Sequence, residues 1–400
     1  LRQVADCLKG GLTATVFMND DVLFPLFLKR GKTPEDVYDY VAIGCYEPAI
    51  MGREMCCSMT IIFNLAKVLE LLLHGGGDPA TGIRLFDVHE GELTDFDAFF
   101  TAYLDALKLL LKRAMHIERL RTAMWSRVNP SPLLSGTMAD CIASGRDVSE
   151  AGTKYNQSGI MCAGIGTLAD SLFAVKRLVF EEKRCTLPEL AAVLRSDWAG
   201  HEELRLYAKM RLPKWGNNLE GPDGLARRVT DFAAELINRE PNGKNGTFQM
   251  GLWSIDNNRL FGKKTGALPD GSRAGEELSK NTGASAGLDR RGVTALINSV
   301  AKLDHTGFAD GSVLDITLHP SAVSGPDGAE LIVDLVRTFF ARGGQSVQFN
   351  IFDAETLRRA QREPEKYANL QVRVCGWNAR FIDLSAEAQE AFIAAAGGEA

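Results

Sequence analysis

An alternation of apolar runs and amphipathic stretches near the C-terminus constrains the fold of this chain more than any other feature. Short runs that favour strands occupy residues 313–318, 347–352 and 371–375, and helical patterns occupy residues 329–342 and 354–361. Strand–helix–strand alternation is typical of domains in which helices cover a sheet, because each element then buries an apolar face against the other. The sequence therefore predicts an α/β fold.

The rest of the chain is predicted to contain loops and amphipathic helices. The run from Gly75 to Pro79 ends one helix, and Ser385 is a favourable N-cap for another. The expected segments are a glycine-rich, loop-like stretch at 10–50 with a short helix near 34–40, helices at 60–74 and 99–120, a polar region at 214–247 with loops around one helix, and a final helix after Ser385.

Composition and charge exclude several classes of function. The chain has 400 residues and a net charge of −6, so it offers no basic surface for nucleic acid or for an anionic membrane. No apolar run approaches the length of a membrane span, and no signal peptide is visible. The eight cysteines form no CxxC pair or zinc pattern, and the six histidines have no metal-ligand spacing. We therefore expect a reducing, cytoplasmic location, no bound metal, and ordinary thiols at Cys56 and Cys57.

A glycine follows the last predicted strand. On an extended backbone Val372 and Val374 share one face, while Arg373 and Cys375 share the other. Taken alone, the segment is a strand that ends at a turn glycine. The full segment reads Val372-Arg373-Val374-Cys375-Gly376-Trp377-Asn378-Ala379.

A second segment of interest lies far upstream. Its Gly44 and Pro48 argue against a helix and favour an extended loop tip. On extended backbone Cys45 and Glu47 project to the same side, so a thiol and a carboxylate are expected to face one space. The simpler alternative is a buried cysteine beside an exposed glutamate. The full segment reads Ile43-Gly44-Cys45-Tyr46-Glu47-Pro48.

The two segments together resemble the active loops of the glycyl radical enzymes. The C-terminal segment is similar to their glycyl-radical loop, and the upstream segment is similar to their thiyl-radical loop. Asn19-Asp20-Asp21 and residues 266–273 resemble further loops of the family. The resemblance covers essentially the whole chain, whereas members of the family are generally much longer. The chain therefore looks like the C-terminal half of such an enzyme, whose N-terminal portion would carry part of the barrel and many substrate contacts.

The resemblance implies a fold and a division into domains. The fold would be half of a ten-stranded α/β barrel of the glycyl radical enzyme type, ringed by helices, with a C-terminal glycyl radical loop. Residues 1–265 would form the C-terminal part of the pyruvate formate-lyase-like barrel domain with the Cys45 loop, and residues 266–400 would form the glycine radical domain. Two loops of the family enter the barrel from opposite ends, so Gly376 and Cys45 are expected to meet.

The resemblance also implies roles for the matching residues. Gly376 would store a radical, Cys45 would form a thiyl, and Glu47 would be the acid or base. A radical on a glycine Cα is delocalised into the flanking amides in a planar state that a side chain would hinder. No bound cofactor is implied, because the radical is derived from the protein and is installed by a separate activating enzyme that uses S-adenosylmethionine and an iron–sulfur cluster. A small-molecule substrate, a homodimer and sensitivity to oxygen are implied as well.

The residues around Cys45 favour one branch of the family. Pyruvate formate-lyase itself uses two adjacent cysteines, whereas Gly44 and Tyr46 flank Cys45 here, so acyl transfer is disfavoured. The Cys-x-Glu pattern resembles the dehydratases and the C–N or C–S lyases, and it predicts elimination of water or another leaving group from a small polar substrate. The alternatives are a formate C-acetyltransferase-like enzyme, an arylacetate decarboxylase, or a non-catalytic half of such an enzyme that is truncated and folds poorly alone or that carries a radical loop for a partner. Trp377 replaces the tyrosine that is common in the family, which indicates a less familiar subgroup.

The segment at residues 163–169 fits the GxGxxA pattern of dinucleotide-binding turns and precedes a predicted helix. The preceding strand is weak by sequence and no clean βαβ unit is apparent after it. A structural segment of the family is therefore the favoured interpretation, with nucleotide binding as the alternative.

Overall fold

Two groups of parallel strands form the framework of the protein, whose computed structural model describes residues 1–89, 91 and 93–397. A parallel bridge between Leu252 and Ser312 links the two groups. The first group comprises, in order, β4 (Glu54–Asn64), β5 (Tyr155–Ala163) and β6 (Phe248–Leu252). The second comprises β7 (Leu314–Leu318) and β8 (Ser346–Ile351), with β1 (Val16–Met18) antiparallel to β8 at its edge.

Two antiparallel hairpins project from this framework. One pairs β2 (Tyr40–Ala42) with β3 (Pro48–Ile50), and the other pairs β9 (Gln371–Arg373) with β10 (Asn378–Arg380). Each hairpin carries one of the two segments that the sequence singled out.

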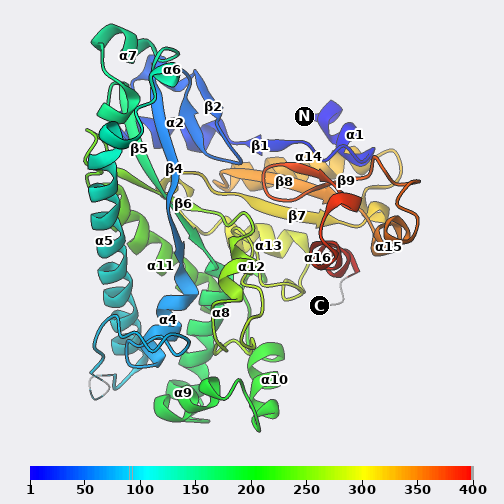
Figure 1. Ribbon diagram of the computed structural model, residues 1–400. Helices are drawn as coiled ribbons and strands as arrows, with labels where there is room; N and C mark the ends of the chain where they lie inside the picture. Colours follow the sequence, from blue (N-terminus) through cyan, green and yellow to red (C-terminus); the bar gives the residue numbers. More distant parts are fainter. Residues whose placement is uncertain (90, 92, 398–400) are drawn as a thin grey trace.

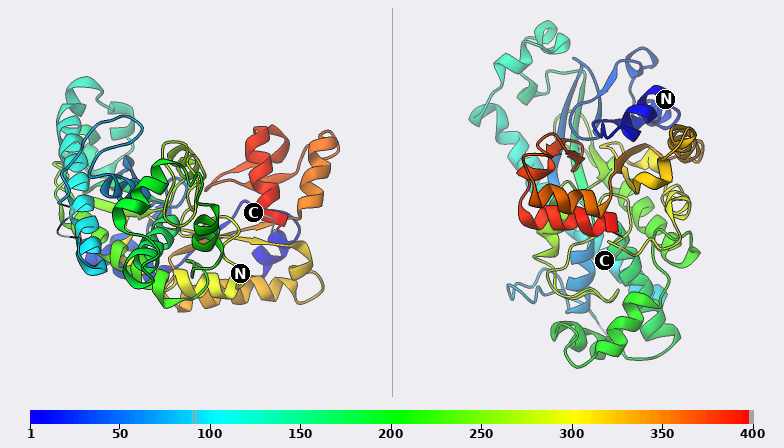
Figure 2. Two further views of the ribbon diagram at one scale, coloured as in Figure 1. Left: turned by 90° about the horizontal axis from the view of Figure 1, so that it is seen from below. Right: turned by 90° about the vertical axis from the view of Figure 1, so that its right-hand side faces the viewer.

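Helices cover the strands, and Figure 1 shows the longest of them, α5 (Phe96–Val128), running along one side of the molecule. The helices before the second strand group are α1 (Arg2–Lys9), α2 (Asp20–Lys29), α3 (Pro34–Val37), α4 (Leu65–Leu73), α6 (Pro132–Ser135), α7 (Ala139–Ser144), α8 (Ile165–Val175), α9 (Leu187–Arg195), α10 (Glu202–Met210), α11 (Glu220–Arg239), α12 (Asn257–Gly262) and α13 (Val293–Val300). The remaining helices are α14 (Gly328–Ala341), α15 (Ala354–Arg362) and α16 (Ala386–Gly397). In Figure 2, α15 and α16 lie side by side in orange and red, and they are in contact.

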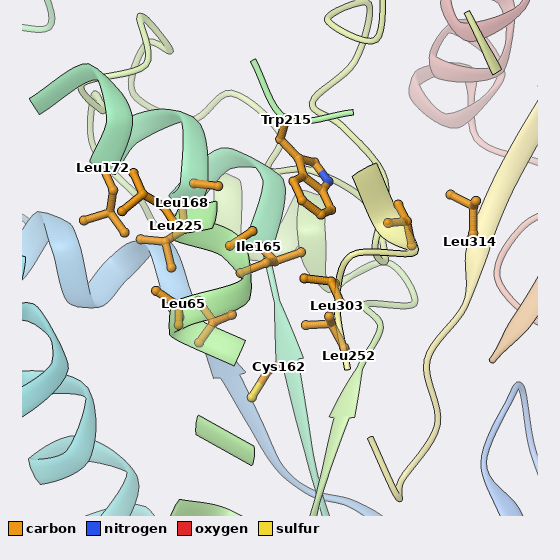
Figure 3. Packing of buried hydrophobic residues seen from close by; sticks show 14 of the residues in the cluster. Leu65, Cys162, Ile165, Leu168, Leu172, Trp215, Leu225, Leu252, Leu303 and Leu314 are labelled. Carbon is orange, nitrogen blue, oxygen red and sulfur yellow. The ribbon is translucent and has the colours of Figure 1, made fainter. Parts of the chain in front are cut away.

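The main core forms where α8 packs between α4, α11 and the first strand group. Every residue of α8 is buried, which matches its predominantly apolar sequence. Figure 3 shows how its apolar side chains meet residues from several other elements. The labelled members of this core are Leu65, Cys162, Ile165, Leu168, Leu172, Trp215, Leu225, Leu252, Leu303 and Leu314.

The C-terminal alternation is confirmed. β7, β8 and β9 begin and end within two residues of the predicted strands, and α14 and α15 do so for the predicted helices. The long helix over 99–120 is confirmed as part of α5, and the single helix within 214–247 is α11. Ser385 accepts a hydrogen bond from the Ala388 amide at 3.3 Å, as expected for the N-cap of α16.

The expected helix at 60–74 is wrong at its start. Residues 60–64 belong to β4, and α4 begins only at Leu65. The β-branched pair Ile61 and Ile62 suits a strand, and residues 61–64 pair in parallel with β5. Asn64 then caps α4 by accepting a hydrogen bond from the Lys67 amide at 3.1 Å. Tertiary pairing therefore overrides the helical spacing in this stretch.

The loop-like interpretation of residues 10–50 misses α2. Asn19 caps this helix by accepting a hydrogen bond from the Asp21 amide at 3.2 Å, and Asp20 and Asp21 lie in the first turn, where the helix dipole favours negative charge. Pro25 lies inside the helix, which is why the sequence pattern did not suggest one. The expected short helix near 34–40 is confirmed as α3.

The GxGxxA segment at residues 163–169 packs closely against neighbouring parts of the chain. Contrary to expectation, β5 is a regular strand of nine residues, and β6 runs parallel beside it. A Cβ added to Gly166 would lie 2.7 Å from the Gly283 carbonyl oxygen and 2.9 Å from Cδ1 of Trp215. Because neighbouring chain fills the space at the start of α8, no room is left there for a pyrophosphate.

Among the described residues, no helix combines the length and apolar character needed to cross a bilayer.

Candidate active site

The tips of the two hairpins meet at the candidate active site. The β2–β3 tip comprises residues 43–47, and the Ile43 amide donates to the Glu47 carbonyl oxygen at 3.0 Å. The β9–β10 tip comprises residues 374–377, and the Val374 amide donates to the Trp377 carbonyl oxygen at 3.0 Å. Hairpins suit this task because their strands anchor both ends of a short tip.

Gly376 lies directly against Cys45. The φ angle of Gly376 is +76°, in the left-handed region that favours glycine. A Cβ added to Gly376 would lie 2.5 Å from Cα and 2.8 Å from Sγ of Cys45, and it would also overlap Cβ of Cys45. The fold thus requires glycine here for two reasons, backbone conformation and close approach to the cysteine.

Asn350 on β8 fixes the strand that leads to Gly376. Its Nδ2 donates to the Arg373 carbonyl oxygen at 3.0 Å, and its Oδ1 accepts from the Arg373 amide at 2.9 Å. The Arg373 guanidinium in turn donates to Oε1 of Gln348 at 2.8 Å and to Oδ1 of Asn378 at 3.2 Å. The backbone and guanidinium of Arg373 are therefore bonded by side chains of β8 and β10.

Two further contacts hold the tip itself. Lys280 donates to the Val374 carbonyl oxygen at 2.5 Å and pairs with Asp315 at 2.9 Å. The Cys375 thiol donates to the Ile255 carbonyl oxygen at 2.9 Å. Burial raises the pKa of Cys375 to about 12, although Lys280 lowers it, so this thiol remains a hydrogen-bond donor at neutral pH.

Tyr46 anchors the other tip. Its side chain is fully buried, its ring packs edge-on against Trp253 with centroids 5.9 Å apart, and its hydroxyl accepts from Nε2 of Gln348 at 2.9 Å. A Cβ added to Gly311 would lie 2.7 Å from the Tyr46 carbonyl oxygen, so this backbone also passes close to the tip. Because Gln348 contacts both Tyr46 and Arg373, one side chain of β8 aligns the two tips.

The Cys45 thiol is half-buried and stays protonated. Burial raises the pKa of Cys45 to about 11, the nearby Glu47 carboxylate contributes to the rise, and Arg373 opposes it. The thiol therefore keeps its hydrogen at neutral pH. A neutral S–H group suits hydrogen-atom transfer, whereas a nucleophile would need the thiolate.

Glu47 is buried, with 4% of its surface exposed. Its Oε2 accepts from the Tyr46 amide at 2.7 Å, and its Oε1 accepts from the Ser58 hydroxyl at 2.8 Å. A Cβ added to Gly44 would lie 2.8 Å from Oε1, so the carboxylate folds back over the tip. The tip is a tight turn and not the extended segment that was expected, and the alternative of an exposed glutamate is wrong.

Ser58 and Asp310 complete the surroundings of Glu47, and sequence reasoning missed both. The pairing of β4 with β5 shifts between Cys57 and Ile61, which leaves Ser58 in an irregular stretch of the strand. Such bulges commonly re-aim side chains beside active sites. The helical spacing of residues 60–74 hides this bulge, and Asp310 belongs to none of the segments that the sequence analysis discusses.

Within residues 1–89, 91 and 93–397, no group of three or more His, Cys, Asp or Glu is arranged to hold a metal ion. Cys56 and Cys57 are free thiols, as expected, with Cys57 accepting a hydrogen bond from Lys244 at 3.3 Å.

Comparison with protein families divides the chain between two descriptions. A family model described as pyruvate formate lyase-like matches residues 1–262, which include Cys45 and Glu47. A second, described as glycine radical, matches residues 278–382, which include Gly376. The two candidate loops thus fall in different matched regions.

Individual relatives extend over nearly the whole chain. The probable dehydratase YbiW of Escherichia coli is 35% identical over 98% of this chain and 50% of that protein. An isethionate sulfite-lyase of Desulfovibrio desulfuricans is 32% identical over 98% of this chain and 48% of that protein. The solved glycerol-bound B12-independent glycerol dehydratase of Clostridium butyricum matches with a TM-score of 0.94 and 35% identity, over 98% of this chain and 50% of that one. The α/β fold expected from the sequence is confirmed by this match, and the chain spans about half the length of the curated relatives it matches.

Proposed function

This chain belongs to the pyruvate formate lyase-like family and carries a glycine radical region, and we propose that it supplies the radical-bearing half of a lyase acting on a small polar substrate. The observation that carries the proposal is the contact between Gly376 and Cys45. A radical stored on Gly376 needs a neighbour that can release a hydrogen atom, and the neutral Cys45 thiol is such a neighbour.

The proposed reaction uses the three residues in turn. The Gly376 radical takes the hydrogen atom of the Cys45 thiol, which leaves the unpaired electron on sulfur. The thiyl then removes a hydrogen atom from a substrate carbon that bears a hydroxyl group, and Glu47 accepts the hydroxyl proton. The resulting carbon radical expels the neighbouring leaving group. Cys45 finally returns the hydrogen atom to the product radical and becomes a thiyl again. This thiyl takes a hydrogen atom from Gly376, which restores the Gly376 radical and the Cys45 thiol.

Elimination is favoured over the other reactions of the family. Acyl transfer in this family uses adjacent cysteines, whereas Cys45 lies between Gly44 and Tyr46. The buried Glu47 carboxylate beside Cys45 supplies the base that elimination needs. The names of the two curated relatives, a dehydratase and a sulfite-lyase, point the same way. A formate C-acetyltransferase-like reaction and an arylacetate decarboxylation are the less favoured alternatives.

The proposal extends to partners and setting. A separate activating enzyme that uses S-adenosylmethionine and an iron–sulfur cluster would install the radical on Gly376. Exposure to oxygen would destroy that radical, so the protein would act anaerobically. The family resemblance also implies a cytoplasmic location and a homodimer. The barrel part would comprise residues 1–265 and the glycine radical domain residues 266–400.

A non-catalytic role is the second candidate, and an exposed apolar strip on the outer strand β4 favours it. Met59 and Ile62 of this strand are exposed, at 37% and 42%. A chain of this kind could carry the radical loop for a partner that supplies the other part of the barrel.

Electron paramagnetic resonance tests the radical assignment. After anaerobic treatment with a cognate activating enzyme, S-adenosylmethionine and reductant, we expect a doublet that arises from coupling to the remaining α-hydrogen of Gly376. Gly376→Ala should abolish the signal. Gly343→Ala is the matched control, because Gly343 also has a positive φ, at +87°, yet has open space around it. A doublet that survives in Gly376→Ala would remove the assignment, and a radical without turnover of any diol, amine or sulfonate substrate would favour the non-catalytic candidate.

A further inference from the structure

A second buried carboxylate, that of Asp310, lies near Glu47 and takes no part in the reaction proposed above. Asp310 is fully buried, and among the described residues neither of its carboxylate oxygens has a hydrogen-bond partner of ordinary geometry. A charged carboxylate in such a place is strongly disfavoured, so the side chain is expected to hold a proton.

The fold makes room for this carboxylate. Gly159 on β5 lies against it, and a Cβ added to Gly159 would overlap all three carboxyl atoms of Asp310. The irregular stretch of β4 brings the Met59 amide and the Ser58 hydroxyl to this carboxylate, and Met59 has a φ of +53°. A left-handed methionine in a bulge is a strained feature of the kind that gathers at functional sites.

Ser58 connects the two acids. Its hydroxyl donates to Oε1 of Glu47 at 2.8 Å, and it also faces Asp310 together with the Met59 amide. We propose that Asp310 and Glu47 share one proton through the Ser58 hydroxyl, with Asp310 as the resting position of that proton. This proposal rests on the proposed role of Glu47 as acid and base.

The charges around the pair fit a single shared proton. Burial raises the pKa of Asp310 well above its usual range, and Glu47 and Glu54 raise it further, while the Met59 amide and the Ser58 hydroxyl oppose the rise. Glu54 already has a cation, because Lys32 pairs with it at 2.5 Å. The thiols of Cys56 and Cys162 also lie near Asp310. Burial raises the pKa of both, that of Cys162 to about 12, so these thiols add no charge at neutral pH.

The proton movements balance without any electron transfer. The O–H bond of Asp310 breaks as its proton passes to Oγ of Ser58, and the Ser58 proton passes to Oε1 of Glu47. The reverse transfer restores the proton to Asp310. While Asp310 holds this proton, Glu47 is a carboxylate that can accept the substrate hydroxyl proton, and Glu47 then gives that proton to the departing hydroxyl or other leaving group. Asp310 touches no substrate in this scheme and acts through Glu47 as a positioning residue.

Infrared spectroscopy of the purified, unactivated protein tests the resting proton without turnover. A buried protonated carboxyl gives a C=O band that shifts in heavy water, and we expect this band in the wild type and its loss in Asp310→Asn. Asp147→Asn is the matched control and should retain the band, because the Asp147 carboxylate accepts hydrogen bonds from three serines and its pKa is lowered despite partial burial. An identical band in Asp310→Asn would overturn the proposal.

Glu47→Gln tests the sharing. It removes the charge that raises the pKa of Asp310, so the pH at which the band disappears should fall. Ser58→Ala should retain the C=O band of Asp310 but remove the hydroxyl through which the proton passes between Asp310 and Glu47. A titration that is the same in wild type and Glu47→Gln would overturn the sharing.

Turnover of the activated enzyme is the last test of the shared proton. Asp310→Asn and Ser58→Ala should lower kcat by about 10-fold or more and shift its pH profile, with KM and the Gly376 radical content near wild type. An unchanged kcat and pH profile in both variants would overturn the proposal. Failure to form any Gly376 radical would contradict the proposed function alone, because the infrared results stand independently of activation.

Discussion

At the scale of single residues, the proposed radical relay requires Cys45 to be a thiol before each turnover. Its pKa of about 11 means that the S–H bond is present below that pH and is lost above it. We expect Cys45→Ala to form the Gly376 radical at wild-type yield and to lose about 10³-fold or more in turnover, since storage precedes the relay. Spin counting and product assays on one sample would separate the two steps. Cys57→Ala is the control, and substantial turnover in Cys45→Ala would send the search to another thiol.

Glu47 and Glu54 are neighbouring buried carboxylates with different expected roles. Glu47→Gln keeps the shape of the side chain but removes the base, so kcat should fall by about 10²–10⁴-fold with little change in KM. Glu54→Gln removes the partner of Lys32 in an ion pair whose side chains are only 1% and 4% exposed. That change should destabilise the fold by about 3 kcal/mol or more and should lower the melting temperature. Assays of turnover per radical and of thermal unfolding distinguish the two, and near-normal turnover in Glu47→Gln would argue against elimination.

At the scale of elements, the position of the radical hairpin depends on its attachment to β8. Asn350→Ala would leave the amide and carbonyl of Arg373 without partners, each at a cost of about 1–3 kcal/mol when buried. We expect a lower melting temperature and faster hydrogen exchange confined to residues 371–380. Gln361→Ala, which removes one exposed hydrogen bond to Glu390, should change neither. Uniformly faster exchange across the chain would show a general loss of stability in place of a local detachment.

Elements whose signals are local could be predicted, and those that depend on distant partners could not. The strands β7, β8 and β9 carry their pattern in their own residues, and so does the helix α5. Residues 60–64 have helical spacing, but they pair with a strand about a hundred residues later, which no local pattern reveals. The hairpin tips with Cys45 and Gly376 could be predicted because each carries a short sequence motif of its own. The contact of Ser58 with Glu47 and the approach of Asp310 arise from three separate segments, so they became visible only in the fold.

At the scale of the whole molecule, the segments before and after Gly376 pack together in one apolar cluster. Residues after it include β10 and α16, and α16 packs on α15. Phe392 of α16 meets Phe352 with ring centroids 5.8 Å apart, and Phe381 and Ile393 are buried in the same cluster as Val372. Cleavage at Gly376 would therefore leave a C-terminal fragment that still has its partners on the other side of the break.

We expect exposure of the activated protein to air to cut the backbone beside Gly376. A denaturing gel should then show a slightly shorter chain, while native size exclusion should show no loss of mass, because the apolar cluster retains the fragment. Phe392→Ala should weaken that cluster and release the fragment after cleavage, whereas Gly376→Ala should prevent the cut. A shortened chain in samples that never received the activating enzyme would contradict a radical origin of the break. Loss of the fragment from wild-type protein under native conditions would contradict this prediction, because the packing of α16 against α15 should hold the fragment in place after the backbone is cut.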